Sequence, residues 1–189
     1  EEHHGLIEDL KATGFDGIEI PLADTPAAED AALTAHLDSL GLRRTAVAAV
    51  AEDHNPVRPD AGTSPAAGAT LKWALHPTAA PGAESLVGPY HSAYKVFTEA
   101  QPTEDEMNWS AEVLREAGEH AATLNVTMAV EFLNRFECYL VNTTEATRDL
   151  LARVDHPSVG MLYDTHHANI EEKDVGEAIR SSASSICHI

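Results

Sequence analysis

The chain has 189 residues, of which 43% are hydrophobic, an ordinary share for a globular protein with a sizeable core. Acidic residues outnumber basic ones by 31 to 12, so the formal net charge is −19. This charge disfavours nucleic acids and anionic membranes as partners, because phosphate contacts require lysine and arginine. The sequence shows neither the roughly 18 uncharged apolar residues of a membrane span nor the features of a signal peptide, so we expect a cytoplasmic protein.

Short β-rich runs alternate with longer amphipathic runs along the chain. Strands are predicted at residues 15–20, 45–50, 84–87, 126–131, 159–164 and 186–189. Helices are predicted at residues 5–13, 27–40, 66–80, 104–124, 145–154 and 172–182. This alternation indicates right-handed βαβ units and a parallel sheet, which a barrel or a doubly wound sheet would satisfy. GxGxxG after the first strand and GxxxxGK[ST] do not occur, which disfavours the dinucleotide-binding and P-loop versions.

The chain shows no second domain or internal repeat, so we interpret residues 1–189 as a single domain. Residues 55–70, rich in proline, alanine and glycine, are predicted to form a long loop over the strand ends. Cys138 and Cys187 form no CxxC motif and are interpreted as reduced, partly buried thiols.

Local signals mark several helix ends. Thr103 and Glu106 have the spacing of a capping box, and so do Asn142 and Glu145. Pro77 falls near the end of the predicted helix 66–80, where it removes a backbone donor. We therefore expect this helix to stop or kink just before Pro77.

Carboxylates end two of the predicted strands. Glu131 follows the apolar run 126–130, and Asp164 follows the run 159–163. The residues after them are also polar: Asn134, Arg135, Glu137, His166, His167 and Asn169. Since the carboxyl ends of barrel strands share one face, these groups would meet there. Two carboxylates with nearby imidazoles suit a divalent metal, although helix capping or ion pairing would also explain Glu131 and Asp164.

The segments around these residues resemble the D-tagatose/D-psicose/L-ribulose 3-epimerase family of xylose-isomerase-like TIM barrels. The similarity rests mainly on E-x-x-N-R-F-E from Glu131 and D-T-x-H-x-N-I-E-E from Asp164, with residues 15–21 and 86–92 also similar. The resemblance covers nearly the whole chain. It implies an α/β fold, a (β/α)₈ TIM barrel that is incomplete here, with about six of eight strands and with the first and last strands missing.

The resemblance also implies roles for the polar residues. Glu131 would be a metal ligand and one of two catalytic carboxylates, and Asp164 a second metal ligand. Glu137 and His167 would bind the sugar. His166 stands where the family usually has phenylalanine, and we interpret it as a packed aromatic replacement. The cofactor would be a divalent metal ion, Mn²⁺ first, with Co²⁺ or Mg²⁺ as alternatives.

The implied reaction is epimerisation of a free ketose at carbon 3, a step of carbohydrate metabolism. One carboxylate removes a proton beside the carbonyl, an enediolate forms, and a second carboxylate returns a proton on the opposite face. His188 matches the first histidine of a family H-x-H pair, whose metal-binding member would fall one residue after Ile189. A further glutamate ligand is also expected beyond Ile189. We therefore expect the isolated 189-residue chain to be inactive and the full-length protein to be active.

Three alternatives stay open. The first is another isomerase of the same barrel family, such as a hydroxypyruvate or aldose–ketose isomerase. The second is a nuclease of the endonuclease IV type, which the net charge of −19 disfavours. The third is a truncated, catalytically inactive barrel fragment. The expected partner is a small ketose, with no nucleic acid and no membrane, and the sequence does not decide whether the full-length protein is a homo-oligomer.

Overall fold

A computed structural model describes residues 4–22, 27–57 and 65–189. All its strands belong to one six-stranded parallel sheet in sequence order. The strands are β1 (Gly17–Pro21), β2 (Arg43–Val47), β3 (Ser85–Gly88), β4 (Thr127–Glu131), β5 (Val159–Leu162) and β6 (Ile186–His188). The helices are α1 (His4–Ala12), α2 (Ala27–Leu40), η1 (Glu52–His54), α3 (Pro65–Ala79), α4 (Glu104–Leu124), α5 (Thr144–Val154), α6 (Thr165–Glu171) and α7 (Val175–Ser182).

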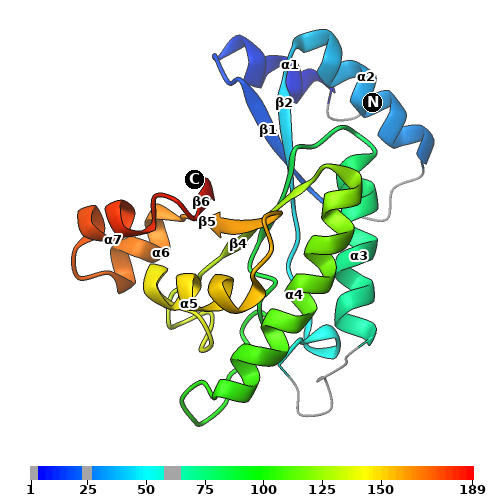
Figure 1. Ribbon diagram of the computed structural model, residues 1–189. Helices are drawn as coiled ribbons and strands as arrows, with labels where there is room; N and C mark the ends of the chain where they lie inside the picture. Colours follow the sequence, from blue (N-terminus) through cyan, green and yellow to red (C-terminus); the bar gives the residue numbers. More distant parts are fainter. Residues whose placement is uncertain (1–3, 23–26, 58–64) are drawn as a thin grey trace.

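The arrangement is that of an incomplete TIM barrel, as predicted. Consecutive strands are neighbours in the sheet and helices connect them, so the crossovers repeat the βαβ unit. The described residues form six strands, where a closed TIM barrel has eight. Figure 1 shows α3 and α4 side by side against the outside of the sheet, with α5 following them around it. Among the helices that the structure describes, none has both the length and the apolar character needed to cross a bilayer.

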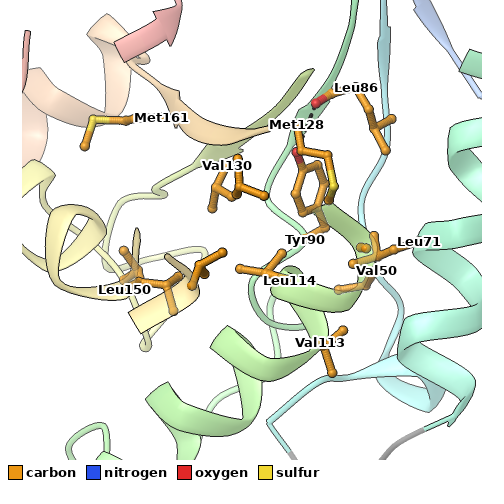
Figure 2. Close-up of a cluster of buried hydrophobic side chains, with 14 of the residues drawn as sticks. Val50, Leu71, Leu86, Tyr90, Val113, Leu114, Met128, Val130, Leu150 and Met161 are labelled. Carbon is orange, nitrogen blue, oxygen red and sulfur yellow. Dashed lines mark hydrogen bonds between the residues drawn. The ribbon is translucent and has the colours of Figure 1, made fainter. Parts of the chain in front are cut away.

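Strand alternation separates two apolar regions. On β4, Met128 and Val130 face the helices and belong to the large core, which also contains Leu114 of α4 (Figure 2). Ala129, between them, belongs to a small cluster on the other face with Val87 of β3 and further residues of neighbouring strands. Because side chains alternate along a strand, the residue two positions after Ala129 also points to that inner face. That residue is Glu131.

The two edge strands also place polar groups on the inner face. Glu19 of β1 accepts a hydrogen bond from the Thr45 hydroxyl of β2 at 3.0 Å. Its carboxylate lies 3.7 Å from Nε2 of His188, which belongs to β6. Polar contacts therefore reach across the inside of the sheet from one edge to the other.

The predicted end of the helix before Pro77 is wrong. Helix α3 continues through Pro77 to Ala79. Pro77 removes only its own bond to the Trp73 carbonyl, one turn earlier, and two further residues of the helix follow it. The buried hydroxyl of Thr78 adds a bond to the Ala74 carbonyl at 2.7 Å.

The long loop predicted for residues 55–70 is also too long, because Pro65–Ala79 is helical; residues 58–64 lie outside the described part.

One of the two predicted capping boxes is confirmed. Thr103 accepts from the Glu106 N–H at 3.2 Å, and the Glu106 carboxylate accepts from the Thr103 N–H at 2.8 Å. The second predicted cap is wrong by one residue. Thr143, not Asn142, caps α5. The Asn142 amide instead donates to two carbonyls in the loop after β4, those of residues 133 and 138.

The region after β5 also differs from its prediction. A separate short helix, α6, follows Asp164 directly, and the predicted helix 172–182 begins only at Val175, after the cap residue Asp174.

Cys138 is buried, but Cys187 is exposed because it lies on the edge strand β6.

Candidate metal and sugar site

Glu131 and Asp164 lie close together at the carboxyl end of the sheet. Glu131 ends β4 and pairs in register with Leu162, two residues before Asp164. Ligand atoms of Glu131, Asp164 and His167 all lie within 4.8 Å of one another. Glu131 and Asp164 also line a pocket of about 360 Å³ on the inner face, together with Glu19. The structure thus brings together the two residues predicted as metal ligands, and adds one imidazole to them.

Asp164 has a structural role besides its place in this cluster. Its Oδ1 accepts hydrogen bonds from the N–H groups of His166, at 2.6 Å, and His167, at 3.0 Å. Asp164 is therefore the N-cap of α6. Both bonds use the same oxygen. Because a carboxylate has two oxygens, capping and cation binding are compatible, and the two interpretations drawn from the sequence do not exclude each other.

The surroundings of Glu131 disfavour its charge. Burial, and then the negative charges of Asp164 and Glu19, raise the pKa of Glu131 from 4.5 to about 7. Only 14% of its side chain is exposed. Acidic groups crowded in this way are stabilised by a bound cation, and their hard oxygen donors suit Mn²⁺, Mg²⁺ or Co²⁺. The donor set therefore fits a divalent metal.

The hydrogen bonds of His167 define its tautomer. Its Nδ1 accepts from the backbone N–H of Asn134 at 3.2 Å and from the Asn134 side-chain amide at 2.9 Å. The Asn134 amide is oriented by its own oxygen, which accepts from the Phe136 N–H at 2.9 Å. With Nδ1 an acceptor, the proton of the neutral ring is on Nε2. Nε2 points toward Glu131, at 3.5 Å, and Glu137, at 3.9 Å.

This tautomer separates His167 from the carboxylates in chemical role. A protonated Nε2 donates hydrogen bonds and has no lone pair for a metal. His167 therefore suits an oxygen of a sugar better than a cation. Burial is the main cause that lowers the pKa of His167 and keeps the ring neutral.

The two sequence motifs are joined by side chains to which the sequence assigned no role. Arg135 donates to the Glu171 carboxylate from its backbone N–H, at 2.6 Å, and from Nε and Nη2, at 3.0 and 2.7 Å. The next residue, Glu172, accepts from the N–H and the hydroxyl of Thr144 at 2.7 and 2.9 Å. These bonds fasten the loop after β4 and the start of α5 to α6. The opposite charges of Arg135 in the first motif and Glu171 in the second were the only signal in the sequence that could have indicated the contact between the two motifs.

The remaining predicted residues lie around this centre. Glu137 is half-buried beside His167. His166, which we interpreted as a packed aromatic replacement, is exposed, and its ring lies edge-on to that of His167, with centroids 5.2 Å apart. His188 lines the same pocket as Glu131 and Asp164.

Replacing Asn134 by Asp is expected to raise the pKa of His167 in the metal-free protein. A carboxylate would replace the amide donor at Nδ1 and would stabilise the protonated ring. Titration of the His167 ring by NMR measures this shift. Asn108→Asp is the control, because Asn108 contacts Arg153 on the surface and is expected to leave the His167 titration unchanged. An unchanged titration in N134D would contradict the assigned tautomer.

Replacing Glu171 by Gln is expected to lower the free energy of unfolding by about 1 kcal/mol at pH 7, because a bidentate charged contact is lost and Arg135 is largely solvated. Arg135 lowers the pKa of Glu171. The contribution of this ion pair to the free energy of unfolding is therefore present above pH 4.5 and is lost as the pH falls below that value. Urea unfolding of E171Q and wild type at pH 7 and pH 3.5 checks both statements. Glu177→Gln, which breaks an exposed pair with Arg180, should change stability little at either pH.

Comparisons with known proteins agree with this geometry. The model of the xylose isomerase-like TIM barrel family matches residues 7–189. A ketose 3-epimerase from Arthrobacter globiformis is 27% identical over 183 residues, which are 97% of this chain and 63% of that protein. A D-psicose 3-epimerase from Ruminiclostridium cellulolyticum is 38% identical over 93 residues, which are 49% of this chain and 32% of that protein.

A solved structure extends the comparison to three dimensions. The crystal structure of D-psicose 3-epimerase with D-tagatose from Clostridium cellulolyticum H10 has a TM-score of 0.90 and 28% identity, and the match covers 98% of this chain and 66% of that chain. The chain thus spans less than two thirds of the length of these relatives. By sequence and by fold, the chain belongs to the xylose isomerase-like TIM barrel family, and its relatives include ketose 3-epimerases.

Proposed function

We propose that the full-length protein is a metal-dependent ketose 3-epimerase. The observation that carries this proposal is the meeting of Glu131, Asp164 and His167 within 4.8 Å at the carboxyl end of the sheet. In TIM-barrel enzymes the active site lies at that end. Relatives along nearly the whole chain are named ketose 3-epimerases, which supports a ketose as the substrate.

Glu131 and Asp164 would hold the cation, for which we propose Mn²⁺, with Co²⁺ or Mg²⁺ as substitutes. Their carboxylates lie at the carboxyl ends of the neighbouring strands β4 and β5, and burial, together with the charges of Asp164 and Glu19, raises the pKa of Glu131 to about 7. When bound, a divalent cation supplies positive charge that stabilises negative charge developing on substrate oxygens.

Glu131 would also be the catalytic carboxylate on one face of the sugar. The reaction begins when a base takes the proton from carbon 3, next to the carbonyl, and it ends when an acid returns a proton on the other face. Glu131 is the best-placed base because only 14% of its side chain is exposed and it points to the inner face. We assign only this one of the two carboxylates that inversion requires.

His167 and Glu137 would orient the sugar. The Nε2–H of His167 can donate to a hydroxyl or carbonyl oxygen, and the nearby Glu137 carboxylate can accept from a hydroxyl. The bonds from Asn134 hold the ring with this proton toward the pocket. A substrate would therefore meet one donor and one acceptor side by side, a pair that suits the vicinal hydroxyls of a free sugar.

The test is a solvent-exchange assay of the full-length protein with D-psicose, D-tagatose and L-ribulose. After treatment with a chelator, the protein should regain activity with Mn²⁺, form the carbon-3 epimer and incorporate deuterium at carbon 3 from D₂O. Aldose formation, with deuterium at carbon 2 of the aldose or at carbon 1 of the recovered ketose, would instead indicate an aldose–ketose isomerase. No exchange into any ketose with Mn²⁺, Co²⁺ or Mg²⁺ would overturn the proposal.

A further inference from the structure

Two histidines meet on the outside of the barrel, away from the site described above. His76 lies in the last turn of α3, and His120 lies one turn before the end of α4. Their Nε2 atoms are 3.1 Å apart, and their ring centroids are 5.0 Å apart with an interplanar angle of 63°. His76 is exposed and His120 half-buried, so solvent reaches the pair.

The separation of the two nitrogens matches that of two ligands on one ion. Metal–nitrogen bonds of about 2.0–2.1 Å place two imidazole nitrogens roughly 2.9 Å apart at a right angle and roughly 3.4 Å apart at a tetrahedral angle. The observed 3.1 Å lies between these values. Two imidazole rings that bind one ion with their nitrogens 3.1 Å apart have ring centres roughly 4.8 Å apart. Two rings joined end to end by a hydrogen bond of the same length have centres roughly 5.4 Å apart. The observed 5.0 Å is nearer to the first arrangement.

The surroundings of the pair favour a cation. Both histidines lie near helix carboxyl ends, where the helix dipole contributes partial negative charge, and the last turn of α4 contains no basic residue. The nearest cation on α3, Lys72, is paired with Glu116 of α4 at 3.1 Å. Lys72 and Glu116 stand four residues before His76 and His120, so the same two helix faces form both contacts.

The pair is remote from the carboxylate cluster because of the barrel topology. The carboxyl ends of α3 and α4 lead into the starts of β3 and β4, whereas Glu131 lies at the end of β4. The two groups are therefore at opposite ends of the sheet, whose strands and helices are labelled in Figure 1, and an ion at one does not serve the other.

We propose that His76 and His120 form a second metal site, one that takes a divalent transition cation preferring imidazole, such as Zn²⁺, Ni²⁺ or Cu²⁺. The ion joins the carboxyl ends of α3 and α4, and water completes its coordination. Because the unfolded chain does not hold the two imidazoles together, binding stabilises the folded state. This site is independent of the proposed epimerase activity.

The experiment uses Ni²⁺ as the probe in a D164N background, which weakens the carboxylate cluster while Asn still caps α6. Calorimetric titration and thermal unfolding are compared for D164N alone and with H76Q, H120Q or H54Q added. His54, an exposed histidine on η1, is the matched control. D164N and its H54Q derivative should bind Ni²⁺ and show a higher Tm with it.

H76Q and H120Q should each weaken Ni²⁺ binding at least about tenfold, because one imidazole alone loses the chelate, and should abolish the rise in Tm. His76 is exposed, His120 is half-buried and neither belongs to the apolar core, so both variants should fold normally. Unchanged Ni²⁺ affinity and Tm shift in both variants, or the loss of both in H54Q, would show that the pair is a hydrogen-bonded contact only and would overturn the proposal.

Discussion

Glu131→Gln is expected to abolish turnover and, in the metal-free protein, to increase stability at pH 8. In the full-length protein, loss of the proposed catalytic carboxylate and metal ligand should lower kcat/KM by about 10³-fold or more. The gain in stability has a separate cause. Burial and the charges of Asp164 and Glu19 raise the pKa of Glu131 to about 7, so ionising it in the folded state is unfavourable. A neutral glutamine keeps the shape of the side chain and removes that cost.

The sign of the pH dependence follows from the raised pKa. Between the ordinary value of 4.5 and about 7, the folded state holds a proton that the unfolded state has released. The free energy of unfolding of the metal-free protein therefore falls as the pH rises through this window. Above pH 7 the full penalty is present, and E131Q should be more stable than wild type by about 2 kcal/mol.

Urea unfolding in the presence of a chelator, at pH 8 and pH 4.5, measures this difference. At pH 4.5 the advantage of E131Q should largely disappear, because wild-type Glu131 is then protonated. Glu145→Gln, in the first turn of α5, is the control for a change of charge alone. A variant E131Q that is less stable than wild type at pH 8 would mean that Glu131 is not a strained, partly buried carboxylate.

The order of the elements could be predicted from the sequence because it depends on local patterns. Apolar runs of four to six residues followed by amphipathic runs indicate strands and helices whatever their neighbours are. The positions of Glu131 and Asp164 followed from the same pattern, since the carboxyl ends of parallel strands share one rim. Their proximity is now observed, with ligand atoms within 4.8 Å.

The details that could not be predicted depend on partners distant in the sequence. Helix α6 is short and its start is fixed by Asp164, which a pattern search counts as the end of a strand. Thr143 rather than Asn142 caps α5, because the Asn142 amide is used by the loop after β4. The tautomer of His167 depends on Asn134, 33 positions away. No local pattern contains such information.

These distant contacts also explain why the two motifs occur together. Asn134 orients His167, and Arg135 grips Glu171, so each motif supplies residues that position the other. The carboxylates Glu131 and Asp164 repel each other, which destabilises the site when no cation is bound. The hydrogen bonds between Asn134 and His167 and the ion pair between Arg135 and Glu171 hold the carboxyl end of the sheet in place against that repulsion. Stability is thus supplied by the motif residues that do not face the pocket.

Gly88→Ala is expected to destabilise the protein more than any other substitution considered. Gly88 ends β3 with φ +133°, a region that residues with a Cβ rarely adopt. A Cβ at this position would lie 2.1 Å from the Ala48 carbonyl oxygen, a backbone atom that cannot move without breaking the pairing of β2 with β3. Strain and overlap together should remove about 3–5 kcal/mol, a large part of the 5–15 kcal/mol typical of a domain.

The loss in G88A is measured by urea unfolding, with circular dichroism as the signal. Gly5→Ala is the matched control, because a Cβ on Gly5 in α1 has nothing within 4 Å and alanine favours helices over glycine by up to about 1 kcal/mol. G5A should therefore be neutral or slightly stabilising. If G88A unfolded at the urea concentration of wild type, the close approach of β3 to residue 48 would be wrong. The inner-face alternation that directs Glu131 into the pocket depends on the same strand register, so the experiment also tests the framework of the site.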